Sequence, residues 1–430
     1  MSGPLSEAAQ ALLVQARQLA QDGDLRAASL FNRLLTLAPD CIEARIFLAG
    51  VSLANGDPLQ ATAQMRLACA SEPDNPHLGK SLATAAFAAG RLDEARSALQ
   101  RTLEQAPYLY EAHLLQGKVL ERQGDRHGAT RAYFRAVTRA QVAEQWLSEA
   151  GIPPRLLADV LHAMDFVRAG RVEILQELLT PLQEQHGGAA MQRVDAALAG
   201  YLGMAPSAPP DARQRPKFLY FPGLPDAPYL ALADFDWIPR LEAAFTSIRD
   251  EASAVLADQS TLTPFLEFGA KDRPQDFLAG AEQPPRWDAF FFYRHGEGQS
   301  ENQQRCPLTS RVLESLPLVR IADHAPEICF SVLSAGTHIL PHHGVTNVRV
   351  VVHLPLIVPE PCALIVGGER HDWQEGRCVA FDDTFEHEAW NRSAQSRVIL
   401  LMDAWNPALT LPERQAMTTL IEGIGELNRG

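Results

Sequence analysis

A glycine recurs at an almost constant interval in the first third of the chain, and this repeat limits the fold more than any other feature. Successive copies are 33, 34 and 34 residues apart, at Gly23, Gly56, Gly90 and Gly124. An amphipathic stretch that contains alanine follows each copy, and three of the units end near a proline, at Pro39, Pro73 and Pro107. Because glycine allows a tight turn and proline ends a helix, each unit is predicted to be a helix–turn–helix.

A single unit of this kind cannot bury its own apolar face, so several units must stack on one another. The pattern over residues 7–141 resembles the tetratricopeptide repeat, in about four copies. The resemblance implies an α-solenoid whose concave surface binds a protein or peptide partner. A scaffold or dimerisation module without a specific ligand is the alternative, because the sequence does not show which face is used.

The composition changes after the repeats and marks further boundaries. A helical pattern continues over residues 142–202, which we interpret as helices that cap the solenoid. Residues 203–216, GMAPSAPPDARQRP, are rich in proline and polar residues and are predicted to form a linker. A second domain is then expected over residues 217–411, followed by a C-terminal helix over residues 412–430.

The charge and cysteine content argue against several classes of function. The chain has 38 Lys and Arg against 52 Asp and Glu, a net charge of −14, which disfavours a nucleic-acid-binding surface. It has no run of eighteen apolar residues that would span a membrane, and its first residues, MSGPLSEAAQ, are not typical of a secretory signal. The six cysteines form no C-x-x-C pair, so we expect reduced thiols and a cytoplasmic protein.

Beyond residue 285 the sequence consists of short segments rich in β-branched and aromatic residues, separated by turn residues. The segments are DAFFFYR, EICFSVLSAG, THILPHH, NVRVVVHLPLIV, CALIVGG, GRCVAFDD, HEAWN and RVILLMDAWN. Many short strands of this type predict a β-sandwich or barrel. The pattern of residues 234–258 predicts a helix that flanks it.

Polar residues lie at intervals among these predicted strands. They are Ser331, His342, His353, His387 and Arg397. In the segment RVVVH, the alternation of a strand places Arg349, Val351 and His353 on the same face of the sheet. Polar side chains on one face of a valine-rich strand indicate a cavity that they line.

Three segments together resemble the aspartyl/asparaginyl β-hydroxylase family of Fe(II)- and 2-oxoglutarate-dependent oxygenases. They are GTHILPHHGVTNVRVVVHLPLIVP, WQEGRCVAFDDTFEHEAWN and SRVILLMDAWNP. With the upstream stretch DFDWIPRLEAAFTSIRDEA, the resemblance covers about residues 217–410. It implies a double-stranded β-helix, a jelly-roll barrel with the metal at one mouth. The expected fold is therefore a multidomain α and β protein, an α-solenoid followed by this oxygenase domain.

The resemblance assigns His342 and His387 as the two protein ligands of Fe(II), which accepts imidazole and keeps positions open for O₂ and a cosubstrate. Most related oxygenases have a carboxylate two residues after the first histidine. This family lacks it, and Gly344 occupies that position here. Asp383 corresponds to an acid beside the metal that holds metal-bound water. The neighbouring His343 is interpreted as a loop residue.

Ser331 and Arg397 correspond to the pair that binds the distal carboxylate of 2-oxoglutarate, because a guanidinium binds a carboxylate bidentately. His353 corresponds to a contact of the other carboxylate. The better-known members have an arginine two residues before this histidine, where this chain has Val351. Cosubstrate geometry or substrate choice is therefore expected to differ. Arg349 corresponds to an arginine near the substrate, with a buried salt bridge as the equally weighted alternative.

The sequence therefore predicts a 2-oxoglutarate-dependent dioxygenase that uses Fe(II) and O₂ to hydroxylate a C–H bond. The expected substrate is a peptidyl Asp or Asn, or another amino-acid side chain, with the repeats recruiting the substrate or a partner. A lipid acyl chain is an alternative substrate. A non-catalytic repeat scaffold with a degenerate binding barrel is an alternative function. The identity of the substrate and the oligomeric state do not follow from the sequence.

Overall fold

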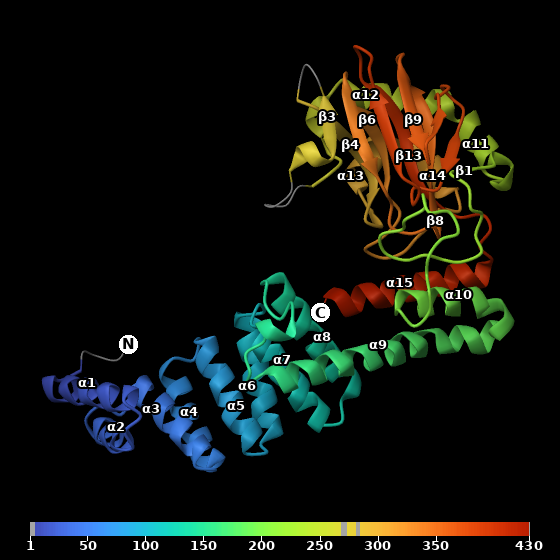
Figure 1. Ribbon diagram of the computed structural model, residues 1–430. Coiled ribbons are helices and arrows are strands. Elements are labelled where there is room, and N and C mark those ends of the chain that lie inside the picture. Colours follow the sequence, from blue (N-terminus) through green and yellow to red (C-terminus); the bar gives the residue numbers. More distant parts are fainter. Residues whose placement is uncertain (1–4, 268–272, 281–283, 430) are drawn as a thin grey trace. The chain divides into compact units, whose positions relative to one another are not determined.

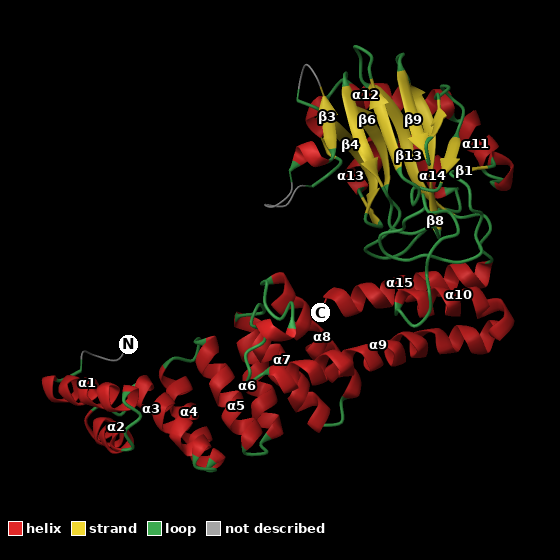
Figure 2. Ribbon diagram, in the orientation of Figure 1, coloured by secondary structure: helices red, strands yellow, loops and turns green. Residues whose placement is uncertain are grey.

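The computed structural model describes residues 5–267, 273–280 and 284–429 of the chain (Figure 1). The chain divides into two compact units, one of residues Met1–Ile174 with Leu427–Gly430 and the other of residues Leu175–Glu426. The first unit is helical and the second contains the described strands (Figure 2). The predicted combination of a helical repeat region and a β-domain is therefore confirmed.

The repeat region consists of four pairs of antiparallel helices. Their bounds are α1 Glu7–Gln21, α2 Arg26–Leu37, α3 Ile42–Ala54, α4 Pro58–Ser71, α5 Pro76–Ala88, α6 Leu92–Gln105, α7 Tyr110–Arg122 and α8 Arg126–Val142. The glycine of each predicted turn has a positive φ: Gly23 69°, Gly56 75°, Gly90 71° and Gly124 80°. Residues with a side chain rarely adopt this conformation, so the glycine repeat sets where each hairpin turns.

The helices of each pair approach closely because small residues lie at their contacts. Alanine is the commonest buried residue among them. A Cβ atom added to Gly117 of α7 would lie 2.3 Å from the ring of Tyr133 of α8, so only glycine fits there without a shift. Tyr133 is fully buried, and its hydroxyl donates a hydrogen bond of 2.6 Å to Glu121.

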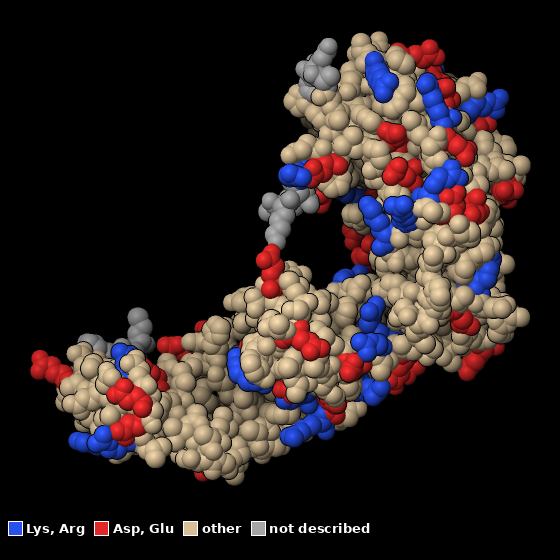
Figure 3. All heavy atoms as spheres, viewed as in Figure 1, with Lys and Arg blue, Asp and Glu red and all other residues tan. Residues whose placement is uncertain are grey.

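Charged side chains on the repeats form ion pairs between neighbouring units at the surface. Arg17 of α1 lies 2.5 Å from Glu43 of α3, and Arg66 of α4 lies 2.5 Å from Glu94 of α6. Figure 3 shows Lys and Arg side chains interspersed with Asp and Glu on the visible face of this region. The acidic excess of the chain therefore does not prevent local pairing of opposite charges.

A short helix, η1 (Glu149–Gly151), precedes the 30-residue helix α9 (Leu157–His186), within which the division between the units falls. In the second unit, α10 (Gly188–Tyr201) contacts the last helix, α15 (Leu411–Arg429), through a 2.7 Å ion pair of Arg193 with Glu413. Residues 203–216, the predicted linker, belong to the second unit. The domain boundaries drawn from the sequence stay predictions.

The β-domain contains two antiparallel sheets. The large sheet has the order β1-β11-β8-β13-β6-β4-β2, with β5 paired to β4, and the small sheet has the order β10-β9-β12-β7-β3. The strands are β1 Tyr229–Leu230, β2 Thr263–Pro264, β3 Leu278–Gly280, β4 Trp287–Arg294, β5 Glu297–Gly298, β6 Ile328–Leu333, β7 Thr337–His342, β8 Arg349–Ile357, β9 Cys362–Val366, β10 Glu369–His371, β11 Val379–Phe381, β12 His387–Asn391 and β13 Arg397–Trp405. Seven of the eight segments expected to form strands contain one of these strands, and the eighth, DAFFFYR, covers β4 except for its first residue.

Apolar side chains cover both faces of the large sheet. One cluster joins it to the small sheet, for example through Phe291 and Leu401 of the large sheet and Leu364 of the small one. On the other face, α11 (Ile238–Ala243), α12 (Phe245–Leu256) and α14 (Pro307–Glu314) pack against the strands. The result is three layers: helices, large sheet and small sheet (Figure 2). The short helices η2 (Leu232–Asp234), η3 (Gln259–Thr261) and η4 (Pro274–Asp276) lie in connections.

Two helical features differ from the sequence-based expectation. The helix expected over residues 234–258 is divided at Ala244 into α11 and α12. The helices α13 (Ser300–Arg305) and α14 occupy a region that was expected to contain only strands and turns. Among the described residues, no helix is both long and apolar enough to cross a bilayer. All six cysteines are free thiols, as expected.

Candidate functional site

A cavity between the two sheets brings together all seven site residues that the sequence singled out. It encloses about 190 Å³. The seven residues are Ser331, His342, Arg349, His353, Asp383, His387 and Arg397. Six of them lie on five strands, which belong to both sheets, and Asp383 lies in a loop. Up to 66 residues separate them along the chain.

Two histidines face each other across neighbouring strands of the small sheet. His342 ends β7, His387 begins β12, and the two are paired in register with ring centroids 4.0 Å apart. In each ring Nδ1 lies within hydrogen-bond distance of a backbone carbonyl oxygen. The distance is 2.8 Å from His342 Nδ1 to the oxygen of Leu340 and 3.0 Å from His387 Nδ1 to the oxygen of Phe385. Donation from Nδ1–H leaves the Nε2 lone pair available, which is how metal-binding histidines are oriented.

Burial keeps both of these imidazoles neutral at physiological pH. It lowers the pKa of His342 to about 4, and the neighbouring His387 contributes to the shift. Burial likewise lowers the pKa of His387 to about 4. A neutral imidazole is the form that binds a metal ion, so the pair fits a divalent cation.

The carboxylate of Asp383 occupies the space beside Gly344. A Cβ atom added to Gly344 would lie 2.1 Å from the carboxyl carbon of Asp383, so no side chain fits at position 344. Asp383 is 6% exposed, and none of the residues that the structure describes forms a hydrogen bond with its Oδ1. The acid near the two histidines is therefore supplied by residue 383 and not by residue 344, and it has an acceptor available.

Arg397 and His353 are buried polar groups whose hydrogen-bonding capacity is not fully used. Arg397 is 1% exposed and its Nε has no hydrogen-bond partner among the described residues, while its guanidinium lies 4.9 Å from the ring centroid of Trp373. Burial lowers the pKa of Arg397 to about 10, so it remains charged at pH 7. Both ring nitrogens of His353 lack a partner. Such groups are costly in isolation, so this site fits a bound carboxylate.

Ser331 is held by an aromatic pair that the sequence did not single out. The indole Nε1–H of Trp287 donates a 2.9 Å hydrogen bond to Ser331 Oγ. Trp287 in turn stacks on Phe265 with ring centroids 3.9 Å apart. Because Oγ accepts this bond, the hydroxyl hydrogen of Ser331 is free to point elsewhere in the cavity.

Arg349 forms a buried salt bridge, one of the two alternatives considered from the sequence. Its Nη1 lies 2.6 Å from Asp403 Oδ1 and 3.5 Å from Asp383 Oδ2. Burial opposes the charge of the guanidinium, but Asp403, Asp383 and Glu327 outweigh it and raise the pKa of Arg349. The backbone N–H of Glu327 donates a 2.8 Å hydrogen bond to Asp403 Oδ2, which fixes this acid.

Val351, His338 and His343 lie near His342 in the sequence or in space, but their contacts differ from those of the two paired histidines. Val351 forms part of the cavity wall between Arg349 and His353, as the alternation of β8 predicts. His338 shares β7 with His342, but its Nε2 lies 2.5 Å from Glu388. His343 lies beyond the end of β7, in agreement with its interpretation as a loop residue.

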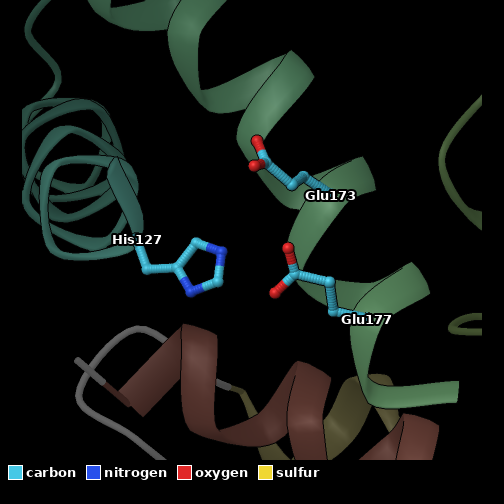
Figure 4. Close-up of side chains that lie close together, drawn as sticks. All are labelled: His127, Glu173 and Glu177. Atoms are coloured by element: carbon cyan, nitrogen blue, oxygen red, sulfur yellow. The ribbon is translucent and has the colours of Figure 1, made fainter. Parts of the chain in front are cut away.

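Three further side chains of metal-ligating type lie on helices outside the cavity. Figure 4 shows His127 on α8, with Glu173 and Glu177 one turn apart on α9. Glu173 already forms an ion pair with Arg126, and Glu177 belongs to the second unit. Exposed acids often gather on helices without binding an ion, so we assign no metal to this group.

Sequence reasoning missed Trp287, Asp403 and Glu327. All three line the cavity. Trp287 directly precedes the predicted strand segment DAFFFYR, and Asp403 lies in the predicted strand segment RVILLMDAWN. A charged residue within an otherwise apolar strand is the signal that could have identified Asp403, because such a residue needs a buried partner.

Comparison with known proteins agrees with the division into helical repeats and a β-domain. A sequence model described as "Aspartyl/Asparaginyl beta-hydroxylase" matches residues 242–407, and one described as "Tetratricopeptide repeat" matches residues 52–119. The first match contains the positions of all seven site residues. The second covers the middle of the predicted repeat region.

Three curated relatives show the extent of the similarity. Aspartate beta-hydroxylase domain-containing protein 2 of Mus musculus is 33% identical over 252 residues, 56% of this chain and 69% of that protein. The ornithine lipid ester-linked acyl 2-hydroxylase of Rhizobium tropici is 32% identical over 192 residues, 44% of this chain and 64% of that protein. The aspartyl/asparaginyl beta-hydroxylase of Homo sapiens is 32% identical over 184 residues, 43% of this chain and 23% of that protein. With tetratricopeptide repeats before its β-domain, the chain belongs to the aspartyl/asparaginyl β-hydroxylase family.

Proposed function

We propose that the protein is an Fe(II)- and 2-oxoglutarate-dependent dioxygenase that hydroxylates a C–H bond. The observation that carries this proposal is the arrangement of one cavity. It contains two neutral imidazoles with available Nε2 atoms and a buried arginine that pairs with no acid in the part of the chain that the structure describes. The imidazoles fit a metal ion, and the arginine fits a carboxylate.

His342 and His387 would hold the iron through Nε2. Their Nδ1 hydrogen bonds to Leu340 and Phe385 fix the ring orientation and raise the basicity of the opposite nitrogen. Bound iron supplies the activation of O₂ that no protein side chain provides. With two protein ligands, the ion keeps several positions open for the cosubstrate, O₂ and water.

Arg397, Ser331 and His353 would hold 2-oxoglutarate. Arg397 offers a charged donor surface and Ser331 a hydroxyl that Trp287 has oriented by its own hydrogen bond. His353 offers a buried ring nitrogen. These contacts would orient the cosubstrate before the reaction, which lowers the entropic part of the barrier.

Asp383 would accept a hydrogen bond from water beside the iron. Its Oδ1 has no partner, while Oδ2 lies 3.5 Å from Arg349. The ion pair fixes the carboxylate, and the free oxygen remains available as an acceptor. We therefore place Asp383 in a supporting role next to the ligands and not among them.

The substrate class that the sequence favours is an amino-acid side chain, such as a peptidyl Asp or Asn, and the charges around the cavity, considered below, bear on this choice. A lipid acyl chain is the second candidate, because the cavity wall is largely apolar and the Rhizobium tropici relative is named as an acyl 2-hydroxylase. We propose that the tetratricopeptide repeats bind a protein or peptide partner. We further propose that the two sheets form a double-stranded β-helix and that the protein is cytoplasmic, where its six thiols would stay reduced.

The test is an anaerobic titration of the metal-free protein with Fe(II) and 2-oxoglutarate. We expect the visible charge-transfer band of a chelated complex in the wild type and its loss in His387→Ala. His343→Ala is the matched control, since His343 is the loop neighbour of a proposed ligand, and it should keep the band. A folded wild type without the band would contradict the proposal and favour a non-catalytic repeat scaffold.

A further inference from the structure

The charged side chains that line the cavity, and the partners that they already have, determine which charge a bound substrate can carry. Two cations and four carboxylates are among the described lining residues: Arg349, Arg397, Glu327, Asp383, Glu388 and Asp403. A substrate carboxylate needs a cation that is not already paired, because an uncompensated buried charge is strongly unfavourable.

The first cation, Arg349, is engaged by two acids of the protein. Its distances of 2.6 Å to Asp403 and 3.5 Å to Asp383 place it between the two carboxylates. Asp403 is 1% exposed, so it has no solvent to compensate it and depends on this pair. Two carboxylates already outweigh the single positive charge of Arg349, so it offers no net positive charge to the carboxylate of a substrate.

The second cation, Arg397, has no acidic partner among the described residues. Under the proposed function it binds the distal carboxylate of 2-oxoglutarate. The cavity then has one anion position, and the cosubstrate occupies it. The inference below rests on this assignment.

The remaining wall offers apolar contacts. Val351, which is 7% exposed, lies between Arg349 and His353 on the cavity face of β8. Other apolar lining residues are Ile339, Leu364, Phe381, Ala389 and Leu401. Glu388 and its partner His338 add an acid at this wall. Burial raises the pKa of the Asp383 carboxyl, and the positive charge of Lys217 partly offsets this rise. Lys217 is exposed, however, and is not part of the lining.

We infer that the group hydroxylated in this cavity is an uncharged aliphatic segment and not an acidic side chain. An aspartate-like substrate would meet Glu388, Asp383 and Asp403 without a free cation to compensate it. An acyl chain or another neutral side chain would instead bury its apolar surface against Val351, Leu364 and Leu401, which is favourable.

The test compares two ligands of equal size on the anaerobic Fe(II)·2-oxoglutarate complex of the full chain, hexanamide and hexanoate. We expect hexanamide to shift the charge-transfer band, and hexanoate to do so only at concentrations at least tenfold higher. Loss of the band, in contrast to a shift, would mean that the added ligand displaces 2-oxoglutarate from Arg397. Such a loss is not taken as binding at the substrate position.

A charge introduced at position 351 sharpens the test. Val351→Arg places an unpaired cation on the cavity face of β8, so it should bind hexanoate at least as well as hexanamide. Val351→Leu is the matched control for added bulk and should keep the wild-type preference. Thermal unfolding checks that each variant is folded before it is compared.

The wild type alone decides the inference if Val351→Arg does not fold. Equal or tighter binding of hexanoate to the wild type, or no band shift with hexanamide, would overturn it. A folded Val351→Arg that gains no hexanoate binding would also overturn it. Absence of the band before any ligand is added would instead contradict the proposed function, so the two failures are distinguishable.

Discussion

The repeat region and the β-domain treat charged side chains in opposite ways. In the repeats, pairs such as Arg66–Glu94 join neighbouring units at the surface, where water also solvates them. In the β-domain, Arg397 and His353 are buried at one cavity with unused hydrogen-bonding atoms. Surface pairs add little to stability, whereas buried unpaired groups reduce it. Under the proposed function a ligand would satisfy the buried groups of the β-domain, whereas the ion pairs of the repeats already satisfy each other.

The largest expected effect is on metal binding in the β-domain. His387→Ala should weaken Fe(II) binding by more than about a hundredfold, because loss of a ligand exceeds the tenfold to hundredfold cost of losing its supporting contacts. Iron content after equilibrium dialysis measures it. The variant should stay folded, since the removed imidazole is a buried group that the fold alone does not need.

A substitution at Arg397 should change 2-oxoglutarate binding without lowering the free energy of unfolding. Arg397→Gln should weaken 2-oxoglutarate binding by roughly 30-fold or more, since losing one partner of a buried charged contact costs about 2–5 kcal/mol. Without 2-oxoglutarate, its free energy of unfolding should not fall, because an isolated buried charge is removed. Calorimetric titration and denaturant unfolding measure the two quantities.

Arg392→Gln is the control for Arg397, as both lie near the same turn but Arg392 is exposed over Trp390. It should leave both quantities unchanged. If Arg397→Gln destabilised the protein without affecting 2-oxoglutarate binding, Arg397 would be a structural residue and the contrast between the two regions would fail.

In the repeats, packing and not charge should control stability. Gly117→Val should destabilise the α7–α8 pair by about 1–3 kcal/mol, because its Cβ would collide with the buried ring of Tyr133. Hydrogen exchange of α7 and α8 resolves this local effect. Gly50→Ala in α3 is the matched control: its Cβ meets nothing within 4 Å, so it should stabilise α3 by up to about 1 kcal/mol.

The smallest expected effect is that of a surface ion pair. A double-mutant cycle on Arg66 and Glu94 should give a coupling of about 0.5 kcal/mol or less at pH 7. The hydrogen bond from Arg66 lowers the pKa of Glu94. The stabilisation by this pair is therefore fully present above the ordinary carboxyl pKa and is lost as the pH falls through the lowered pKa of Glu94. Repeating the cycle at low pH should give no coupling. A coupling of several kcal/mol would remove the distinction between the regions.

Local patterns account for the parts of the fold that the sequence predicted. The glycine period located the turns of the repeats because a positive φ is a local requirement, and runs of β-branched and aromatic residues located the strands. Alternation located the shared face of Arg349, Val351 and His353. The seven site residues were identified by resemblance to a family motif. Their roles as ligands and cosubstrate contacts stay predictions.

The features that were missed depend on contacts between distant residues. Trp287 contacts Ser331 across 44 positions, and Arg349 contacts Asp403 across 54. The helices α13 and α14 lack a long apolar period and are set by tertiary contacts, such as the bonds from Leu308 and Thr309 backbone N–H groups to Glu251. Local periodicity does not report partners of this kind.

The overlap of the Asp383 carboxylate with the missing side chain of Gly344 has an evolutionary consequence. Two acids cannot occupy this place together, because a Cβ on residue 344 would lie 2.1 Å from the Asp383 carboxyl carbon. A single mutation that adds a third protein ligand at 344 therefore produces a clash and not a new site. A lineage that acquires an acid there must also shorten or displace the side chain of residue 383. Among descendants of this chain, the two positions are expected to covary, with one carboxylate between them.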